Sequence, residues 1–179
     1  MGILRRLLIS GFIAAVVSSG FVVPAGATGF RANRPDRCGL LKNSEVGKAF
    51  GGRVRHRVRT SDGCAWDVRT PAGVVADVNV TTLSGYDKKR FDAERAELVS
   101  PSTGLQAQTQ TVRHVGDRAY YVPEDPEFKT REIRVLKDNQ QLVVHEVDLP
   151  DIGSPNGSGT PQEVQAKVTK LAKLAAERL

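Results

Sequence analysis

Arginine occupies every second position of one short stretch, which reads Arg-Val-Arg-His-Arg-Val-Arg. In an extended strand alternate side chains point to one face, so we expect a single row of Arg53, Arg55, Arg57 and Arg59. The planar guanidinium fork suits phosphate and carboxylate groups, which makes this row a candidate anion-binding surface. The competing interpretation, which we favour, is that acids on neighbouring strands pair with the arginines. The acids considered are Asp67, Asp77, Glu132 and neighbouring acids.

The two cysteines, Cys38 and Cys64, are the second set of residues with chemistry of their own. In an exported chain two cysteines are expected to form a disulfide. Closing a loop of this length stabilises a fold by roughly 3–4 kcal/mol. A catalytic cysteine would need a nearby base, and a metal site would need four closely spaced ligands. The sequence shows neither.

The remaining titratable residues show no catalytic spacing. The histidines His56, His114 and His145 are far apart, and packed or surface positions are commoner for such residues than a shared metal. Acids in the charged segment at 86–98 read as a solvated helix face rather than as an acid and base pair: Asp87, Asp92, Glu94 and Glu97. Glu124 and Asp125 stand between two prolines and read as a turn.

No nucleophile elbow, phosphate loop or dinucleotide fingerprint occurs in the sequence. We therefore name no catalytic residue, no metal ligand and no cofactor. Whether the protein is an enzyme stays open, and the sequence favours a non-catalytic role.

The N-terminal segment is typical of an export signal. Arg5 and Arg6 precede an apolar run at 7–23, and Ala25-Gly26-Ala27 offers a cleavage site. We expect residues 1–27 to be a signal peptide, with retention as a membrane anchor as the alternative. Cleavage would leave 152 of the 179 residues and lower the formal net charge from +6 to +4. A charge this modest does not indicate a nucleic-acid partner.

The arginine stretch is expected to follow a short helix and to open a sheet. Asn43 is the predicted N-cap of that helix, and Gly51-Gly52 ends it. After the arginines, Ser61-Asp62-Gly63 supplies a turn. Apolar and polar residues then alternate through Trp66 and again through Val78. This pattern predicts strands with one apolar and one wet face, as in antiparallel sheets.

A charged helix and four extended segments are expected in the second half. The helix, at 86–98, has a weak apolar stripe through Tyr86, Phe91 and Leu98. The extended segments are predicted at 106–115, 117–122, 133–136 and 142–147. The last two would form a hairpin, and apolar residues on both faces leave open which face is buried.

The C-terminal helix is the clearest predicted element. Thr160, Pro161 and Glu163 combine an N-cap, a proline at the first helical position and a capping-box glutamate. An apolar stripe from Val164 to Leu179 then faces away from the lysines. The expected role is to cover the sheet, with binding to a membrane surface as the alternative.

Together these elements predict an α+β fold. It consists of a single antiparallel β-sheet flanked by a short N-terminal helix, a middle helix and a C-terminal amphipathic helix. The domain is expected at residues 38–179, after a flexible lead-in at 28–37 and the signal peptide at 1–27.

Several short motifs resemble those of one family. They are Cys38-Gly39-Leu40-Leu41, Glu45-Val46, Phe50-Gly51-Gly52, Gly63-Cys64-Ala65-Trp66, Val115-Gly116-Asp117-Arg118-Ala119 and Glu177-Arg178-Leu179. On these motifs the mature chain resembles the actinobacterial domain-of-unknown-function 3558 family of exported proteins and lipoproteins. The resemblance implies an envelope or extracellular protein with a helix-flanked antiparallel sheet and a bridged cysteine pair, and it implies no reaction. The chain departs from the family in lacking a lipidation cysteine at its mature start, and in having Lys42 where members commonly show threonine.

These observations predict a secreted cell-envelope domain with one disulfide. The expected role is non-catalytic binding of an envelope ligand or protein, with an anionic polymer as one candidate partner. No nucleic-acid partner and no transmembrane segment after signal cleavage are expected. The alternative is an enzyme that acts on a cell-envelope polymer with acids that only the fold brings together.

Overall fold

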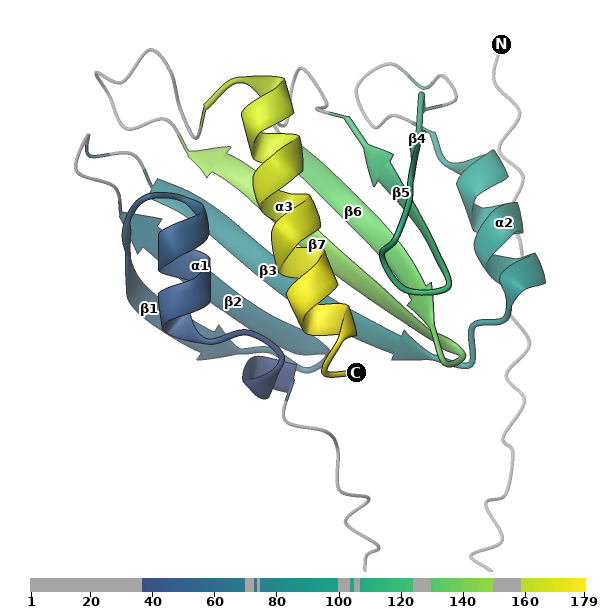
Figure 1. Cartoon of the computed structure of the whole chain (residues 1–179), viewed down its shortest axis with the longest axis horizontal. Helices are drawn as coiled ribbons and strands as arrows, with labels where there is room; N and C mark the ends of the chain where they lie inside the picture. The colour runs from purple at the N-terminus through teal and green to yellow at the C-terminus, as the bar shows by residue number, and fades with distance from the viewer. Residues whose placement is uncertain are drawn as a thin grey trace, which may run out of the picture. The chain divides into compact units, whose positions relative to one another are not determined.

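A computed structural model describes residues 37–69, 73, 75–99, 104, 107–123, 130–149 and 159–179. The predicted signal peptide at 1–27, residues 28–36 of the predicted lead-in at 28–37, and Glu124–Asp125 lie outside the described residues. In the described part, seven strands form one antiparallel sheet in the order β1-β2-β3-β7-β6-β5-β4 (Figure 1). The predicted α+β fold, with one antiparallel sheet and three helices, is confirmed.

The elements follow the predicted order. The first are a short 3-10 turn (Arg37–Gly39), α1 (Asn43–Ala49), β1 (Arg53–Arg59), β2 (Gly63–Arg69), β3 (Val75–Ser84) and α2 (Lys88–Glu97). The rest are β4 (Gln110–Val112), β5 (Arg118–Val122), β6 (Thr130–Lys137), β7 (Gln140–Leu149) and α3 (Pro161–Ala176). The extended segment predicted at 106–115 contributes only the short β4. It ends there because the chain turns back, with left-handed backbone at His114 and Gly116.

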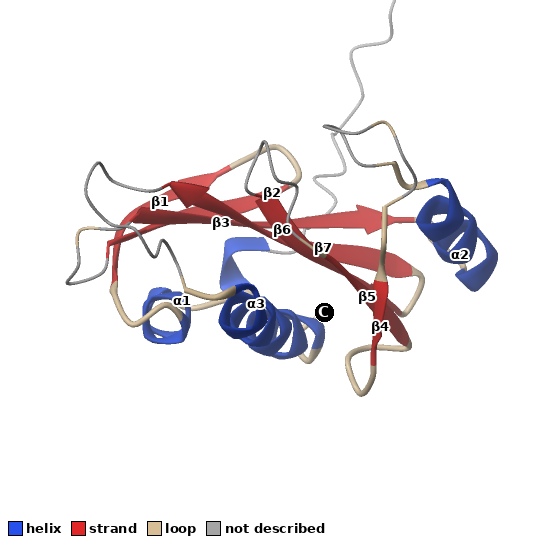
Figure 2. Cartoon of the chain, turned by 90° about the horizontal axis from the view of Figure 1, so that it is seen from above, coloured by secondary structure: helices blue, strands red, loops and turns tan. Residues whose placement is uncertain are grey.

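Helices α1 and α3 lie on one face of the sheet (Figure 2). Beneath them is the main core, in which Trp66, Leu142 and Leu171 are fully buried. The question left open for β7 is thereby answered: Leu142 and Val144 face these helices, whereas Val143 points to the other face. The apolar stripe predicted for α3 covers the sheet, as expected.

The start of α1 differs from the prediction. Lys42, not Asn43, occupies the N-cap position, and its backbone N–H donates to Glu45 Oε2 at 2.8 Å. Asn43 is the first helical residue, and its Oδ1 accepts a hydrogen bond from Trp66 Nε1 at 3.1 Å. A buried indole N–H needs an acceptor, so this contact uses the Asn43 side chain that capping would have required.

The predicted disulfide between Cys38 and Cys64 is present. The two Cα atoms are 5.1 Å apart, and both side chains belong to the main core. The bridge joins the 3-10 turn to β2, so it holds the start of α1 against the sheet.

Polar contacts fasten both ends of α3. Thr160 and Glu163 form the predicted capping box, in which the Thr160 N–H donates to Glu163 Oε2 at 2.8 Å. At the other end Lys137 Nζ donates to the Ala176 carbonyl at 2.6 Å. No helix in the described ranges is long and apolar enough to span a membrane.

Helix α2 packs on the opposite face of the sheet, over its β5–β6 end (Figure 2). The ring of Phe91 lies 5.1 Å from that of Tyr120, and Tyr86 and Leu136 complete this smaller cluster. The predicted stripe through Tyr86, Phe91 and Leu98 is therefore the packing face of α2.

An ion pair that the sequence reasoning missed lies on the helix-covered face of β6 and β7. Arg131 Nη1 is 3.1 Å from Glu146 Oε2, and both side chains are almost completely buried. The two residues are directly opposite each other in the antiparallel ladder. A charge at this depth requires such a partner, because desolvation of a lone charge is costly.

Candidate functional site

The predicted arginine row is broken by a β-bulge in β1. Val54 lies opposite Val68, but His56 lies opposite Asp67, so the register shifts at Arg55. A bulge inserts one residue and reverses the alternation of all that follow. The four arginines therefore do not share one face, and neither do Val54, His56 and Val58, which alternate with them in the sequence.

The bulge divides the arginines between the two faces. Arg57 and Arg59 lie opposite Trp66 and Cys64, on the side of α1 and α3. Arg53 lies opposite Arg69, on the other side, because Val68 next to Arg69 points into the core.

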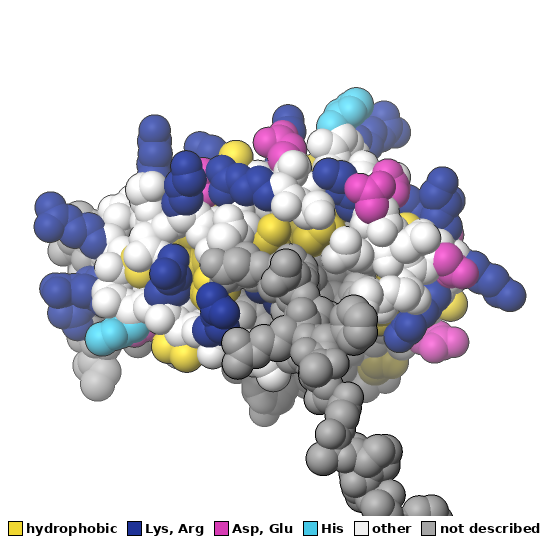
Figure 3. Space-filling model, turned by 90° about the horizontal axis from the view of Figure 1, so that it is seen from below, with side chains coloured by type: hydrophobic (Ala, Val, Ile, Leu, Met, Phe, Trp, Pro, Cys, Tyr) yellow, Lys and Arg dark blue, Asp and Glu magenta, His cyan; other side chains and the backbone are white. Residues whose placement is uncertain are grey.

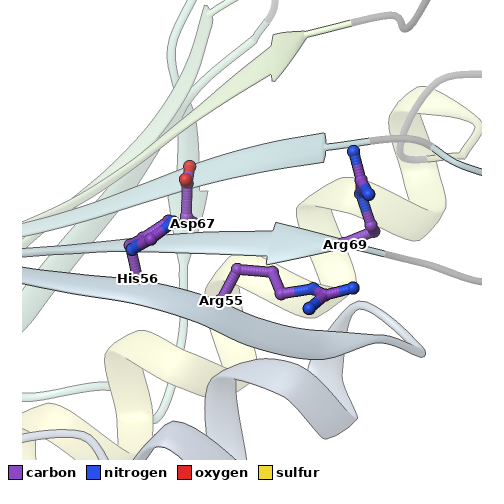
Figure 4. Close-up of a pocket in the computed structure, with 4 residues that line it drawn as sticks. All are labelled: Arg55, His56, Asp67 and Arg69. Carbon is purple, nitrogen blue, oxygen red and sulfur yellow. The ribbon is translucent and has the colours of Figure 1, made fainter.

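Arg55 joins Arg69 in a hollow of about 300 Å³ whose other lining residues are His56 and Asp67. Figure 4 shows the two guanidinium groups at one end of this hollow, and His56 with Asp67 at the other. We name Arg53, Arg55 and Arg69 the arginine cluster. The surface of β1, β2 and β3 that faces away from α1 and α3 is named the outer face.

Two carboxyl groups lie side by side on the outer face. Asp67 on β2 is directly opposite Asp77 on β3. Burial, followed by the hydrogen bond and the negative charge of Asp67, raises the pKa of Asp77 to about 6. A second hollow of about 250 Å³ includes both carboxyl groups, together with His56, Val58 and Asn79. Two carboxylates that lie side by side repel each other, so the pair favours a state in which it holds one shared proton.

In the part of the chain that the structure describes, Arg53, Arg55 and Arg57 do not form the cross-strand ion pairs that we favoured. Asp67 interacts with Asp77, and Glu132 pairs with Arg134 at 2.7 Å. Within the described ranges, the guanidinium groups of Arg53, Arg55 and Arg69 have no ion pair with any acid. Lys and Arg side chains gather at the β1 end with few acids between them, whereas the α2 end mixes both signs (Figure 3).

The three histidines do not converge. His56 is exposed on β1, His114 lies in the turn after β4, and His145 lies on β7, where burial lowers its pKa. Among the described residues, no group of three His, Cys, Asp or Glu side chains could hold a metal ion.

Of the acids predicted to form a solvated face, Asp87, Asp92 and Glu97 are exposed and Glu94 is half-buried. Three of them also have partners. Asp87 Oδ1 accepts the Arg90 N–H at the helix start, and Asp92 pairs with Arg118. Glu94 contacts Arg134 through one oxygen and accepts a hydrogen bond from Gln141 Nε2 at 2.9 Å through the other. These contacts attach α2 to the sheet.

No family model, curated protein or solved structure matches this chain. The family resemblance suggested by the short motifs therefore stays a prediction.

Sequence reasoning did not identify the Asp67–Asp77 pair as a feature. Both residues lie at polar positions of alternating strands, and Pro71-Ala72-Gly73 predicts a turn between them. Counting back from that turn could have placed them opposite each other. The bulge at Arg55 had no comparable signal, because the alternation of Arg with other residues is unbroken through it.

Proposed function

We propose that this chain is an exported, non-catalytic binding module of the cell envelope, and that its outer face binds an anionic polymer through the arginine cluster. The disulfide fits an oxidising compartment, where a 3-10 turn and a strand can be covalently joined. The resemblance to exported proteins supports the same location.

The observation that carries the proposal is the placement of Arg53 directly opposite Arg69, with Arg55 beside them. Like charges opposite each other in a ladder destabilise a sheet. Here no described acid forms an ion pair with them, and no described helix covers them. A phosphate or carboxylate group placed between the guanidinium forks would relieve the repulsion and accept charge-assisted hydrogen bonds.

The proposal is tested by binding of polyphosphate and of poly-L-glutamate to the full chain over a salt series. Replacing the cluster (Arg53→Gln, Arg55→Gln and Arg69→Gln together) should weaken polyphosphate binding. It should also reduce the slope of log K against log[salt] by roughly two, because each phosphate contact contributes about 0.7.

The matched control removes the same charge elsewhere, with Lys88→Gln, Lys170→Gln and Lys173→Gln combined; all three lysines are exposed on helices. This control should retain most of the binding. Equal losses in the two triple variants would show that only net charge matters. That result, or no binding at all, would contradict the proposal.

The carboxyl pair favours a second candidate function, hydrolysis of an envelope polymer. One carboxyl of a pair with separated pKa values acts as general acid and the other as base. Asp77, with its pKa near 6, would hold the proton in mildly acidic conditions.

The assay for this candidate is release of new reducing ends from a cell-wall polysaccharide. Asp67→Asn and Asp77→Asn should each abolish the release. The Lys88, Lys170 and Lys173 control variant should leave it intact. Absence of turnover in the unaltered protein would remove this candidate and leave the binding proposal standing.

A further inference from the structure

A further hollow, larger than the two on the outer face, lies far from the arginine cluster, between α2 and the β4–β5 hairpin. Its volume is about 490 Å³, within the range typical of small-molecule sites. Strand β4 forms the edge of the sheet opposite to β1, so this hollow and the arginine cluster are at opposite ends. Figure 1 shows α2 beside this hairpin.

Arg95 of α2 lines this hollow and is held in one orientation by neutral groups. Its Nε donates to Thr109 Oγ1 at 2.8 Å, and its Nη1 donates to Thr111 Oγ1 at 3.1 Å. The centre of its guanidinium group lies 5.2 Å from the centroid of the Tyr120 ring. Two hydroxyl acceptors and an aromatic face fix the guanidinium plane without neutralising its charge.

Two acids of α2 that lie close to Arg95 in the sequence are engaged elsewhere. Asp92, which also lines the hollow, pairs with Arg118, and Glu94 contacts Arg134 and Gln141. No described carboxylate pairs with Arg95. Of the five N–H groups that a guanidinium offers, two are used by the threonines. The remaining donors are available to a bound group.

Other residues of the hollow indicate what kind of ligand it suits. Its apolar lining residues are Phe91, Val112, Val115 and Ala119. Arg113 and His114, both exposed, add donors at the hairpin turn, and the acid there, Asp117, accepts the backbone N–H of Asp138 at 3.3 Å. A cationic anchor beside an apolar lining suits a ligand with an anionic head and an apolar body.

We infer that this hollow is a second binding site, specific for a small carboxylate or phosphate that carries a flat apolar group. Arg95 binds the anionic head through its fork. Thr109 and Thr111 are positioning residues that hold the guanidinium group ready. Because the fork is already ordered, little conformational entropy is lost on binding.

The test uses four probes with the full chain: benzoate, phenyl phosphate, inorganic phosphate and uncharged benzyl alcohol. Titration calorimetry should show saturable binding of benzoate or phenyl phosphate. That affinity should be at least about tenfold tighter than for inorganic phosphate or benzyl alcohol, each of which has only one of the two features. The tighter of the two aromatic anions identifies the head group.

Variants separate charge from orientation. Arg95→Gln should weaken binding of the aromatic anion at least about tenfold, and Arg95→Lys should restore only part of it, since lysine keeps the charge without the fork. Thr109→Val with Thr111→Val leaves the charge unchanged and should still cost several-fold. The control is Arg90→Gln on the same helix, whose guanidinium stacks on Tyr86 outside the hollow. That variant should bind as the unaltered protein does.

Three results would overturn the inference: no saturable binding of either aromatic anion, equal binding of inorganic phosphate, or unchanged binding in Arg95→Gln. If Arg95→Gln does not fold, the threonine double variant decides the question in the same way. The triple variant of the arginine cluster should bind the aromatic anion normally. This site is therefore tested independently of the proposed function.

Discussion

The surface of the sheet that faces away from α1 and α3 has two halves, which differ in whether their arginines form ion pairs with acids. Over β5 and β6, Arg134 lies between Glu132 and Glu94, and α2 covers the group. Over β1 and β2, Arg53 faces Arg69 and no described acid pairs with either. Both halves contain arginines and acids in alternating strands. The difference between the halves shows that ion pairing of the arginines depends on strand register and on the helix that packs over them, not on amino-acid composition.

The half beneath α2 has the features of a structural contact. Arg134 is only 16% exposed, and the charges of its two glutamates keep its pKa raised despite burial. In the uncovered half, residues of the same charge lie opposite each other: Arg53 faces Arg69, and Asp67 faces Asp77. Repulsion kept at a surface has no structural benefit, so a ligand that relieves it is the simplest role for it.

The largest expected effect on stability concerns the disulfide, which lies in the main core on the opposite side of β2 from the arginine cluster. Replacing both cysteines (Cys38→Ala with Cys64→Ala) should lower the free energy of unfolding by about 3–4 kcal/mol, because the unfolded chain regains the entropy of a 26-residue loop. Urea unfolding measures the loss. A reducing agent should produce a comparable loss in the unaltered protein and none in the variant. Equal stability of the variant and the oxidised protein would contradict this role.

The next largest effect is a difference in stability between substitutions in the two halves. Glu94→Ala removes a partner of both Arg134 and Gln141 and should cost about 2 kcal/mol, because a partly buried charge loses one of its two partners and the buried Gln141 amide loses an acceptor. Arg55→Gln, in the uncovered half, should change stability by less than about 0.5 kcal/mol. Denaturant unfolding of both variants tests the contrast. Similar values for the two would break the comparison.

A smaller effect is expected for Asp77, whose replacement should raise the free energy of unfolding rather than lower it. The raised pKa of Asp77 means that the folded state holds a proton more tightly than the unfolded state, so stability falls as pH rises from about 4 to about 6. Asp77→Asn should therefore stabilise the protein at pH 7.5, by about 1 kcal/mol after allowance for solvent screening. Unfolding measured from pH 4 to pH 8 should show this gain vanish at the acid end. A gain independent of pH would refute the shared proton.

The smallest effect lies at the end of α3, on the covered face. Arg178 Nη1 donates to Glu45 at 2.7 Å and to the Leu40 carbonyl at 2.8 Å. The hydrogen bond from Arg178, together with that from the Lys42 N–H, lowers the pKa of Glu45 to about 2. The contribution is therefore full above pH 4.5 and is lost as pH falls towards 2.

Glu45→Gln should cost about 0.5–1 kcal/mol at pH 7, the usual value of an exposed pair. The difference from the unaltered protein should shrink on acidification. Arg178→Gln should behave in the same way, and the double variant should be no worse than either single one. Additive losses would show that the two residues do not act together.

Much of the fold could be predicted because its signals are local. The capping box of Thr160 and Glu163 needs only residues three apart, and Asp138-Asn139 adopts the left-handed backbone that a tight hairpin requires. The α3 stripe predicted the covered face for the same reason. The site was predicted less well. Of the four arginines named from the sequence, Arg53 and Arg55 belong to the arginine cluster and Arg57 and Arg59 lie on the other face. Arg69 was not named.

The sequence by itself determined the α+β architecture, the order of its elements and the pairing of Cys38 with Cys64, since periodicity, caps and cysteine number are properties of the chain. Only the tertiary structure decided where charges meet. The bulge at Arg55, the contact of Asp67 with Asp77 and the hollow beside Arg95 all depend on how distant segments align. A shift of one residue in a strand exchanges the two faces, and the amino-acid pattern of β1 is compatible with either register.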